Sequence, residues 1–138
     1  MFRNQKSINQ NMSIFFFTVL SIVFFTGCEK RDVDILIVLP DGLVGDFHLV
    51  ESVNGRVVDV DAAGRFKYEI TKTGRNEFVD LSPFYEWHSI ECIYQNGTRL
   101  PNSDTAVGAG PDDLVLDEGN TSSDGELFFS VLPMKEVQ

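Results

Sequence analysis

The sequence predicts an all-β domain, a small antiparallel β-sandwich of about seven strands, preceded by a signal-peptide helix. Short runs that alternate between apolar and polar residues recur along residues 33–138, as expected of half-buried strands. Turn residues separate these runs roughly every 8–12 residues. Beyond the N-terminal segment 1–27, no window carries the apolar stripe of an amphipathic helix.

The N-terminal segment 1–27 has the pattern of an export signal. It contains no Asp or Glu, two positive charges at Arg3 and Lys6, and an uncharged run over residues 13–25. A basic start, an apolar stretch and small residues at the exit are typical of a secretory signal peptide. The run is shorter than the roughly 20 residues that cross a bilayer, so a permanent transmembrane helix is the weaker interpretation.

The exit of this segment, Phe25-Thr26-Gly27-Cys28, resembles the lipobox of bacterial lipoproteins. The resemblance implies cleavage before Cys28, a diacylglyceryl thioether on its sulfur and an acyl chain such as palmitate on the new N-terminus. It also implies an extracytoplasmic protein anchored in the cell membrane or the outer membrane. The alternative is an ordinary signal peptide in which the cysteine is incidental.

Charge and tether length set further expectations. Removing 27 of the 138 residues leaves 111, with all 21 acids but 9 of the 11 bases, a net charge of −12. This acidity argues against nucleic acid as a partner and leaves membrane attachment to the lipid. Residues 28–32 form the predicted lipidated tether, whose last four residues reach about 14 Å.

The strands follow in order. Residues 34–39 form a short apolar run that ends at Pro40-Asp41-Gly42, and residues 46–53 alternate up to Asn54-Gly55. This dipeptide predicts a two-residue hairpin, with the chain returning over residues 56–60. The remaining strands are predicted at residues 65–71, 77–81, 86–95, 98–100 and 126–132. Residues 101–125 are predicted to form a long acidic loop, with or without a short edge strand at 114–116.

Two segments resemble a known group. Leu39–Phe47, with its Leu-Pro-Asp-Gly-Leu-Val-Gly start, and Asp61–Phe66 followed by Thr73-Gly74 are similar to an uncharacterised group of bacterial lipoproteins. Their extracytoplasmic domain is transthyretin-like or carboxypeptidase-regulatory-like. The resemblance covers residues 34–100 and implies a β-sandwich, but its motifs are turns and transfer no catalytic residue.

No catalytic constellation is visible. The chain has no Gly-x-Ser-x-Gly motif, and its two histidines, His48 and His88, lack metal-ligand spacing. With Cys28 lipidated, Cys92 has no disulfide partner and is expected to be a buried thiol. We therefore expect no catalytic residue, no metal and no cofactor.

Two features remain open. The acids of the loop could hold Ca²⁺, although their spacing does not fit the usual calcium loop; they are Asp112, Asp113, Asp117, Glu118, Asp124 and Glu126, with Asn120. The aromatic run from Phe84 to Trp87 is either an exposed platform for a sugar or protein or, as we favour, a place where Trp87 closes the core.

The function predicted from these observations is a membrane-anchored, non-catalytic binding or scaffolding module of the cell envelope, with an envelope protein or a glycan as partner. The alternative is a carbohydrate- or calcium-binding accessory domain. A hydrolase is the least favoured interpretation, because no nucleophile and base are visible together.

Overall fold

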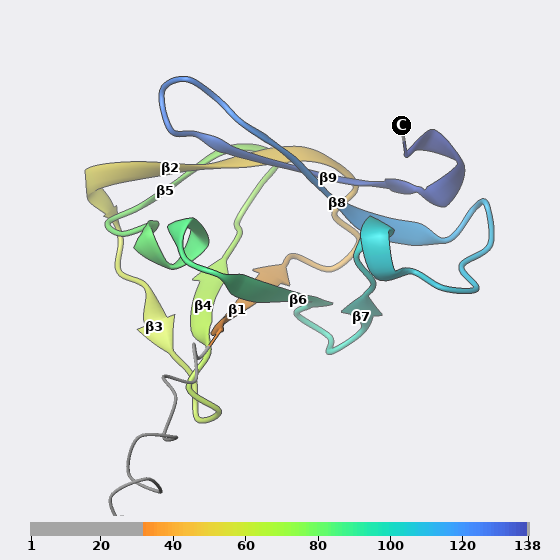
Figure 1. Ribbon diagram of the computed structural model, residues 1–138, viewed down its shortest axis with the longest axis horizontal. Coiled ribbons are helices and arrows are strands. Elements are labelled where there is room, and N and C mark those ends of the chain that lie inside the picture. The colour runs from red at the N-terminus through yellow and green to blue at the C-terminus, as the bar shows by residue number, and fades with distance from the viewer. Residues whose placement is uncertain (1–31, 138) are drawn as a thin grey trace, which may run out of the picture. The chain divides into compact units, whose positions relative to one another are not determined.

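The structure, a computed structural model, describes residues 32–137, and these form two β-sheets (Figure 1). Sheet A has the order β3 (Asp59–Val60), β4 (Phe66–Glu69), β1 (Val33–Leu39), β6 (His88–Tyr94), β7 (Arg99–Leu100). Sheet B has the order β5 (Gly74–Phe78), β2 (Gly45–Arg56), β9 (Leu127–Pro133), β8 (Leu114–Thr121). The helical segments of this part of the chain are three short 3-10 helices, η1 (Ser82–Tyr85), η2 (Ser103–Thr105) and η3 (Met134–Glu136).

The predicted all-β class is therefore confirmed, with nine strands in place of about seven. The predicted signal-peptide helix over residues 1–27, the lipidation site Cys28 and the tether up to residue 31 lie outside the described residues. They stay predictions.

The prediction of purely antiparallel sheets is wrong, because both sheets are mixed. Strand β1 pairs in parallel with β4 and with β6, and β2 pairs in parallel with β5. The chain passes repeatedly from one sheet to the other, so many neighbours within a sheet are joined by a crossing instead of a hairpin. Such crossings permit parallel pairing, which a tight turn does not.

Strand β1 is the centre of sheet A. Its residues from Ile35 to Leu39 form an almost continuous apolar run, of which Ile35, Ile37 and Leu39 are at most 1% exposed. Runs of this kind are typical of strands with parallel neighbours. Ile37 lies in register with Tyr68 of β4 on one side and Cys92 of β6 on the other.

The predicted hairpin at Asn54-Gly55 is wrong. Both residues lie inside β2, which continues to Arg56, and neither has a positive φ angle, so the turn that this dipeptide favours is excluded. A Cβ atom on Gly55 would lie within 2.7 Å of the Phe78 Cα. Glycine is required here because two backbones touch.

The segment predicted as a long loop over residues 101–125 holds more structure than expected. The edge strand anticipated at residues 114–116 extends over eight residues as β8 and pairs with β9 in antiparallel register. Helix η2 and an isolated bridge between Asn102 and Leu116 order the part before it.

One hydrophobic cluster draws on both sheets. Phe47 of β2 stacks on Phe129 of β9 with ring centroids 5.4 Å apart, while Tyr68 of β4 meets Phe78 of β5 edge to face at 5.0 Å. Sheet B lies over sheet A in Figure 1. This packing between the sheets fixes the positions of the strand ends.

Candidate functional site

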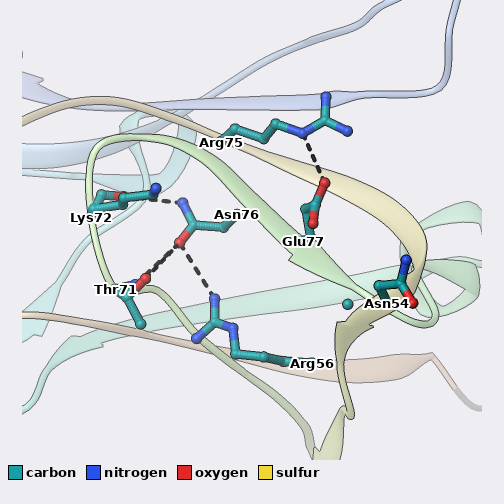
Figure 2. Close-up of a pocket in the computed structure, with 8 residues that line it drawn as sticks. Asn54, Arg56, Thr71, Lys72, Arg75, Asn76 and Glu77 are labelled. Atoms are coloured by element: carbon teal, nitrogen blue, oxygen red, sulfur yellow. Dashed lines mark hydrogen bonds and ion pairs between the residues drawn. The ribbon is translucent and has the colours of Figure 1, made fainter.

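An open pocket of about 320 Å³ lies beside β5, next to the point where β2 bulges away from it. The end of β2, the connection between β4 and β5, and β5 itself supply its walls (Figure 2). The lining residues are Asn54, Gly55, Arg56, Thr71, Lys72, Arg75, Asn76 and Glu77. We call this the β2–β5 pocket.

Arg56 is held in a fixed position at this pocket. Its Nη1 donates to the carbonyl oxygen of Glu69, and its Nη2 donates to Asn76 Oδ1 at 3.4 Å. The guanidinium carbon lies 4.6 Å from the centroid of the Phe78 ring, a cation–π distance. These contacts hold one positive charge in place without neutralising it.

Asn76 is the buried polar centre of the pocket and is only 2% exposed. Its Nδ2 donates to the carbonyl oxygens of Lys72 and Gly74 at 3.0 and 3.1 Å. Its Oδ1 accepts the Thr71 amide hydrogen at 3.1 Å, besides the bond from Arg56. Because buried polar groups need partners, this amide side chain fixes the connection that carries Lys72.

Basic side chains without a carboxylate partner are concentrated at the β2–β5 pocket. Of the 11 lysines and arginines, four precede residue 32, so seven lie in the described part. Five of these form ion pairs with carboxylates: Arg65, Lys67, Arg75, Arg99 and Lys135. Within residues 32–137, Arg56 and Lys72 are the two that do not, and both line the β2–β5 pocket.

Arg75 adds a third cation that a ligand could share. Its Nε lies 3.1 Å from Glu77 Oε1, and its Nη1 lies 3.2 Å from Glu126 Oε1. Arg75 is exposed, and exposed pairs of this kind contribute only about 0–1 kcal/mol. An anion that enters the pocket can therefore displace Glu77 from Arg75 at small cost, and the chemistry of the lining is that of an anion-binding site.

A second, larger pocket of about 550 Å³ lies at the end of β6, against β7 and the loop after it. Its cation is Arg99, which pairs with Glu91 at 3.8 Å. Most of its wall is apolar or small, including Leu100, Pro101 and Val107. Among the described residues that line it, there is no pair of bases without carboxylate partners like the pair in the β2–β5 pocket.

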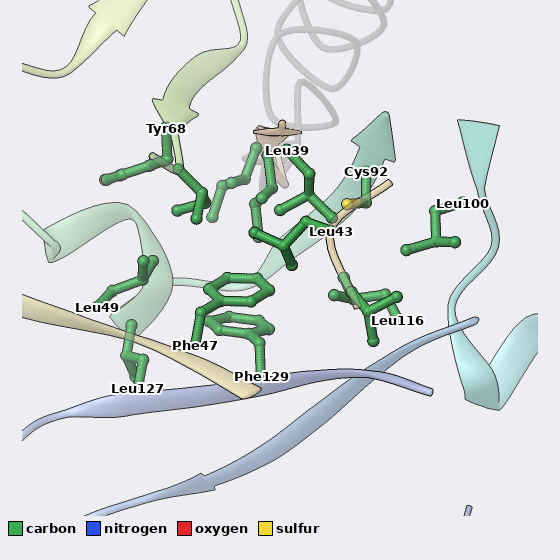
Figure 3. Close-up of a cluster of buried hydrophobic side chains, with 14 of the residues drawn as sticks. Leu39, Leu43, Phe47, Leu49, Tyr68, Cys92, Leu100, Leu116, Leu127 and Phe129 are labelled. Atoms are coloured by element: carbon green, nitrogen blue, oxygen red, sulfur yellow. The ribbon is translucent and has the colours of Figure 1, made fainter. Parts of the chain in front are cut away.

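Cys92 is buried, as predicted. It is 0% exposed and is free of disulfides, and Figure 3 shows it among the side chains of the core. Burial raises the pKa of its thiol to about 12, so the reactive thiolate is scarce at neutral pH. The thiol fills space in sheet A.

The two histidines occupy separate places on the domain. His48 stacks on Phe128 with centroids 5.3 Å apart and has Nε2 3.8 Å from Glu126 Oε2. The Nδ1 atom of His88 lies 2.8 Å from the Glu86 carbonyl oxygen, and Nε2 lies 3.7 Å from Glu118 Oε1. Each has partners within the protein, as expected of partly buried histidines.

Three of the acids considered for calcium are bonded to other groups of the protein. Asp113 Oδ2 accepts the Gly110 amide hydrogen, Asp117 Oδ1 accepts the Ser103 hydroxyl, and Asp112 pairs with Lys135. No group of three or more His, Cys, Asp or Glu side chains that could hold a metal ion occurs between residues 32 and 137.

The favoured interpretation of the aromatic run, in which Trp87 closes the core, is wrong. Trp87 is 76% exposed, while Phe84 is 7% exposed and packs 4.9 Å from Tyr68 and 6.0 Å from Phe129, centroid to centroid. Pro83 lies in the first turn of the 3-10 helix η1, and this turn directs Phe84 inward. The next two aromatics, Tyr85 and Trp87, remain on the surface.

Sequence reasoning did not single out Arg56, Lys72 or Asn76. The scarcity of bases in an acidic chain marks Lys72 and Arg75 as a local pair, but Arg56 lies far from both along the chain. The parallel pairing of β2 with β5 brings Arg56 close to Lys72 and Arg75. The hairpin predicted at Asn54-Gly55 was incompatible with this pairing.

Across residues 32–137, no helix has the length and apolar character needed to cross a membrane. No protein-family model, no curated protein and no solved structure matches the chain.

Proposed function

We propose that this protein is a lipid-anchored, non-catalytic binding module of the bacterial cell envelope. In this proposal Cys28 carries the lipid, residues 32–137 form a β-sandwich outside the cytoplasm, and the β2–β5 pocket receives an anionic group of the partner. The observation that carries the binding role is the position of Arg56 and Lys72. They are the two described bases without a carboxylate partner, and they line one pocket.

The charge balance favours a specific anion site over a general attraction. A mature net charge of −12 repels anions from most of the surface. Affinity for a carboxylate or phosphate must then come from local, charge-assisted hydrogen bonds, and a fixed guanidinium suits them. An envelope polymer or an envelope protein can present either group.

The anchor rests on the sequence pattern that ends at Phe25-Thr26-Gly27-Cys28. Two or three acyl chains would hold the protein stably on a membrane, whereas one chain binds only marginally. The resemblance of residues 34–100 to transthyretin-like lipoprotein domains is consistent with the proposed β-sandwich and stays a prediction.

Mass spectrometry of the mature N-terminus tests the anchor. The full chain is expressed in a bacterium, extracted in detergent, and its N-terminal peptide is weighed. The expected product begins at Cys28 and carries the mass of a diacylglyceryl group. A mature protein that begins elsewhere, or whose Cys28 is unmodified, would refute the anchor.

Binding to defined envelope fragments tests the pocket. The detergent-extracted protein is titrated with a soluble muropeptide, which presents carboxylates, and with a glycerol-phosphate oligomer. We expect one of them to bind, and Lys72→Ala to weaken binding by about 1.5–3 kcal/mol, the range for a hydrogen bond to a charged group.

Lys135→Ala is the matched control, because it also removes one positive charge but Lys135 is paired with Asp112 away from the pocket. It should leave the affinity within about twofold of the parent. If neither fragment binds, or if both variants weaken binding equally, the pocket is not the binding site.

A further inference from the structure

The one tryptophan of the chain lies on the surface of the domain. The Trp87 side chain is 76% exposed, and that of its neighbour Tyr85 is 58% exposed. Large aromatic side chains usually bury most of their area. The Tyr85 hydroxyl donates to the Gly125 carbonyl oxygen at 3.3 Å, whereas the Trp87 side chain has no hydrogen bond within the described part of the chain. The two rings are therefore available to a partner outside the domain.

Trp87 lies beside the place where the chain enters the domain. The Val33 amide donates to the Trp87 carbonyl oxygen at 2.8 Å. Val33 is the first residue of β1 and lies in register with His88, the first residue of β6. Five residue steps separate Val33 from Cys28, so their Cα atoms lie at most about 18 Å apart.

We infer that Trp87 and Tyr85 insert into the head-group region of the membrane beside the lipid on Cys28 and so set the orientation of the domain. This inference rests on the proposed lipidation of Cys28. Tryptophan and tyrosine rings favour the boundary between water and lipid, because each has an apolar body and a polar group. An anchor on so short a tether raises the effective lipid concentration at these rings, so each needs little affinity of its own.

Charge near the rings limits how deeply they enter. Glu86 lies between them in sequence, and Asp34 is the second residue of β1; both are exposed. Carboxylates are repelled by anionic lipids and stay hydrated. The rings are therefore expected in the head-group layer of a zwitterionic bilayer, with the opposite end of β6 directed away from it.

The fluorescence of Trp87 tests this inference directly, since no other tryptophan contributes. The full protein is extracted in detergent, its N-terminal mass is measured, and it is reconstituted into phosphatidylcholine vesicles with brominated acyl chains. We expect a blue-shifted emission, a loss of intensity with brominated lipid, and protection from iodide in the water phase. Tyr85→Ser should reduce the quenching and leave the fold intact, because the side chain is mostly exposed.

The double variant Trp87→Phe/Val107→Trp is the matched control. Val107 is 99% exposed and lines the larger pocket together with Tyr94, the last residue of β6. The seven residues of β6 place this end about 20 Å from His88. A tryptophan at position 107 should remain accessible to iodide and unaffected by brominated lipid.

The results distinguish the membrane from other partners of the two rings. If Cys28 is lipidated but brominated lipid leaves Trp87 unchanged, the inference is overturned while the proposed function stands. If a soluble glycan then shifts the Trp87 emission, the rings form a sugar platform instead. If Cys28 is unmodified, the proposed lipid anchor is refuted and the inference with it.

Discussion

Gly55 in β2 lies against the main chain of Phe78 in β5. A Cβ atom added to Gly55 would approach the Phe78 nitrogen to 2.6 Å and its Cα to 2.7 Å, closer than two atoms can pack. The contact occurs at the bulge where Glu51 and Arg56 of β2 both align with Phe78. It brings the Arg56 guanidinium over the Phe78 ring and so helps to form the β2–β5 pocket.

Gly55→Ala should destabilise the domain by about 1–3 kcal/mol, the usual cost of forcing atoms into packed space. Val53, two residues earlier in β2, is 94% exposed, so Val53→Ala should change stability by less than about 0.5 kcal/mol. Urea unfolding of both variants measures the difference. A Gly55→Ala protein as stable as the parent would show that the two strands do not touch.

Asn76→Ala should lower stability by at least about 2 kcal/mol. It removes the hydrogen bonds to Lys72, Gly74 and Thr71, and each buried polar group left unpaired costs about 1–3 kcal/mol. Asn120, which is exposed in β8, offers a comparison in which the same substitution should have little effect. Thermal unfolding followed by circular dichroism distinguishes the two.

Phe84→Ala should cost about 3–5 kcal/mol, the typical loss for a buried phenylalanine, because its ring packs on Tyr68 and Phe129. Trp87→Ala should leave stability nearly unchanged, since the Trp87 side chain is exposed. Denaturant midpoints compare them. The reverse order would mean that Trp87, as favoured from the sequence, closes the core.

Cys92 should resist thiol reagents in the folded protein. With a pKa of about 12, the thiolate fraction at pH 8 is on the order of 10⁻⁴, and the side chain has no exposed surface. Iodoacetamide should therefore label Cys92 only after denaturation, as read by peptide mass spectrometry. Rapid labelling under native conditions would contradict the buried position.

Asp61 should give the domain a pH-dependent stability. Its Oδ1 accepts the amide hydrogens of Arg65 and Ala63, both at 2.9 Å, and its Oδ2 pairs with the Arg65 guanidinium. The hydrogen bond from the Arg65 backbone is the largest cause that lowers the pKa of Asp61 below its ordinary value of 3.8.

A carboxylate with a lowered folded-state pKa stabilises the fold above the unfolded pKa and loses this effect as pH falls through the folded pKa. Asp61→Ala should thus be less stable than the parent at pH 7 and at pH 5, and the gap should narrow below about pH 4. Urea unfolding at three pH values tests this. A gap of equal size at pH 7 and pH 2.5 would exclude the ionised carboxylate as its source.

Local patterns predicted the elements that depend on local chemistry. The alternation of Phe66, Tyr68 and Ile70 placed β4, and the turn at Asn96-Gly97 led from β6 to β7 with the Gly97 amide bonded to the Tyr94 carbonyl oxygen at 2.8 Å. Such turns and strands depend only on the backbone angles of a few residues and on having one face exposed to water and one face buried.

Prediction failed where the role of a residue depends on backbone that lies far away along the chain. Asn54-Gly55 has the composition of a hairpin turn, yet Gly55 is needed for its contact with Phe78, which belongs to another strand. The apolar run of residues 34–39 predicted a strand, but not the two parallel neighbours of β1. In the segment 101–125, only a short edge strand at 114–116 was anticipated, whereas β8 continues to Thr121 because its polar end pairs with β9.

The sequence by itself determined the all-β class, the positions of most strands, and the acidity that makes two unpaired bases informative. The predictions of a signal peptide and of lipid on Cys28 also rest on sequence alone. Only the tertiary structure decided that β2 and β5 run side by side, that Arg56 joins Lys72 at one pocket, and that Phe84 is buried while Trp87 is exposed. The physical reason is that alternation and turn chemistry act over a few residues, whereas pairing between strands depends on which apolar faces meet when the two sheets close on one core.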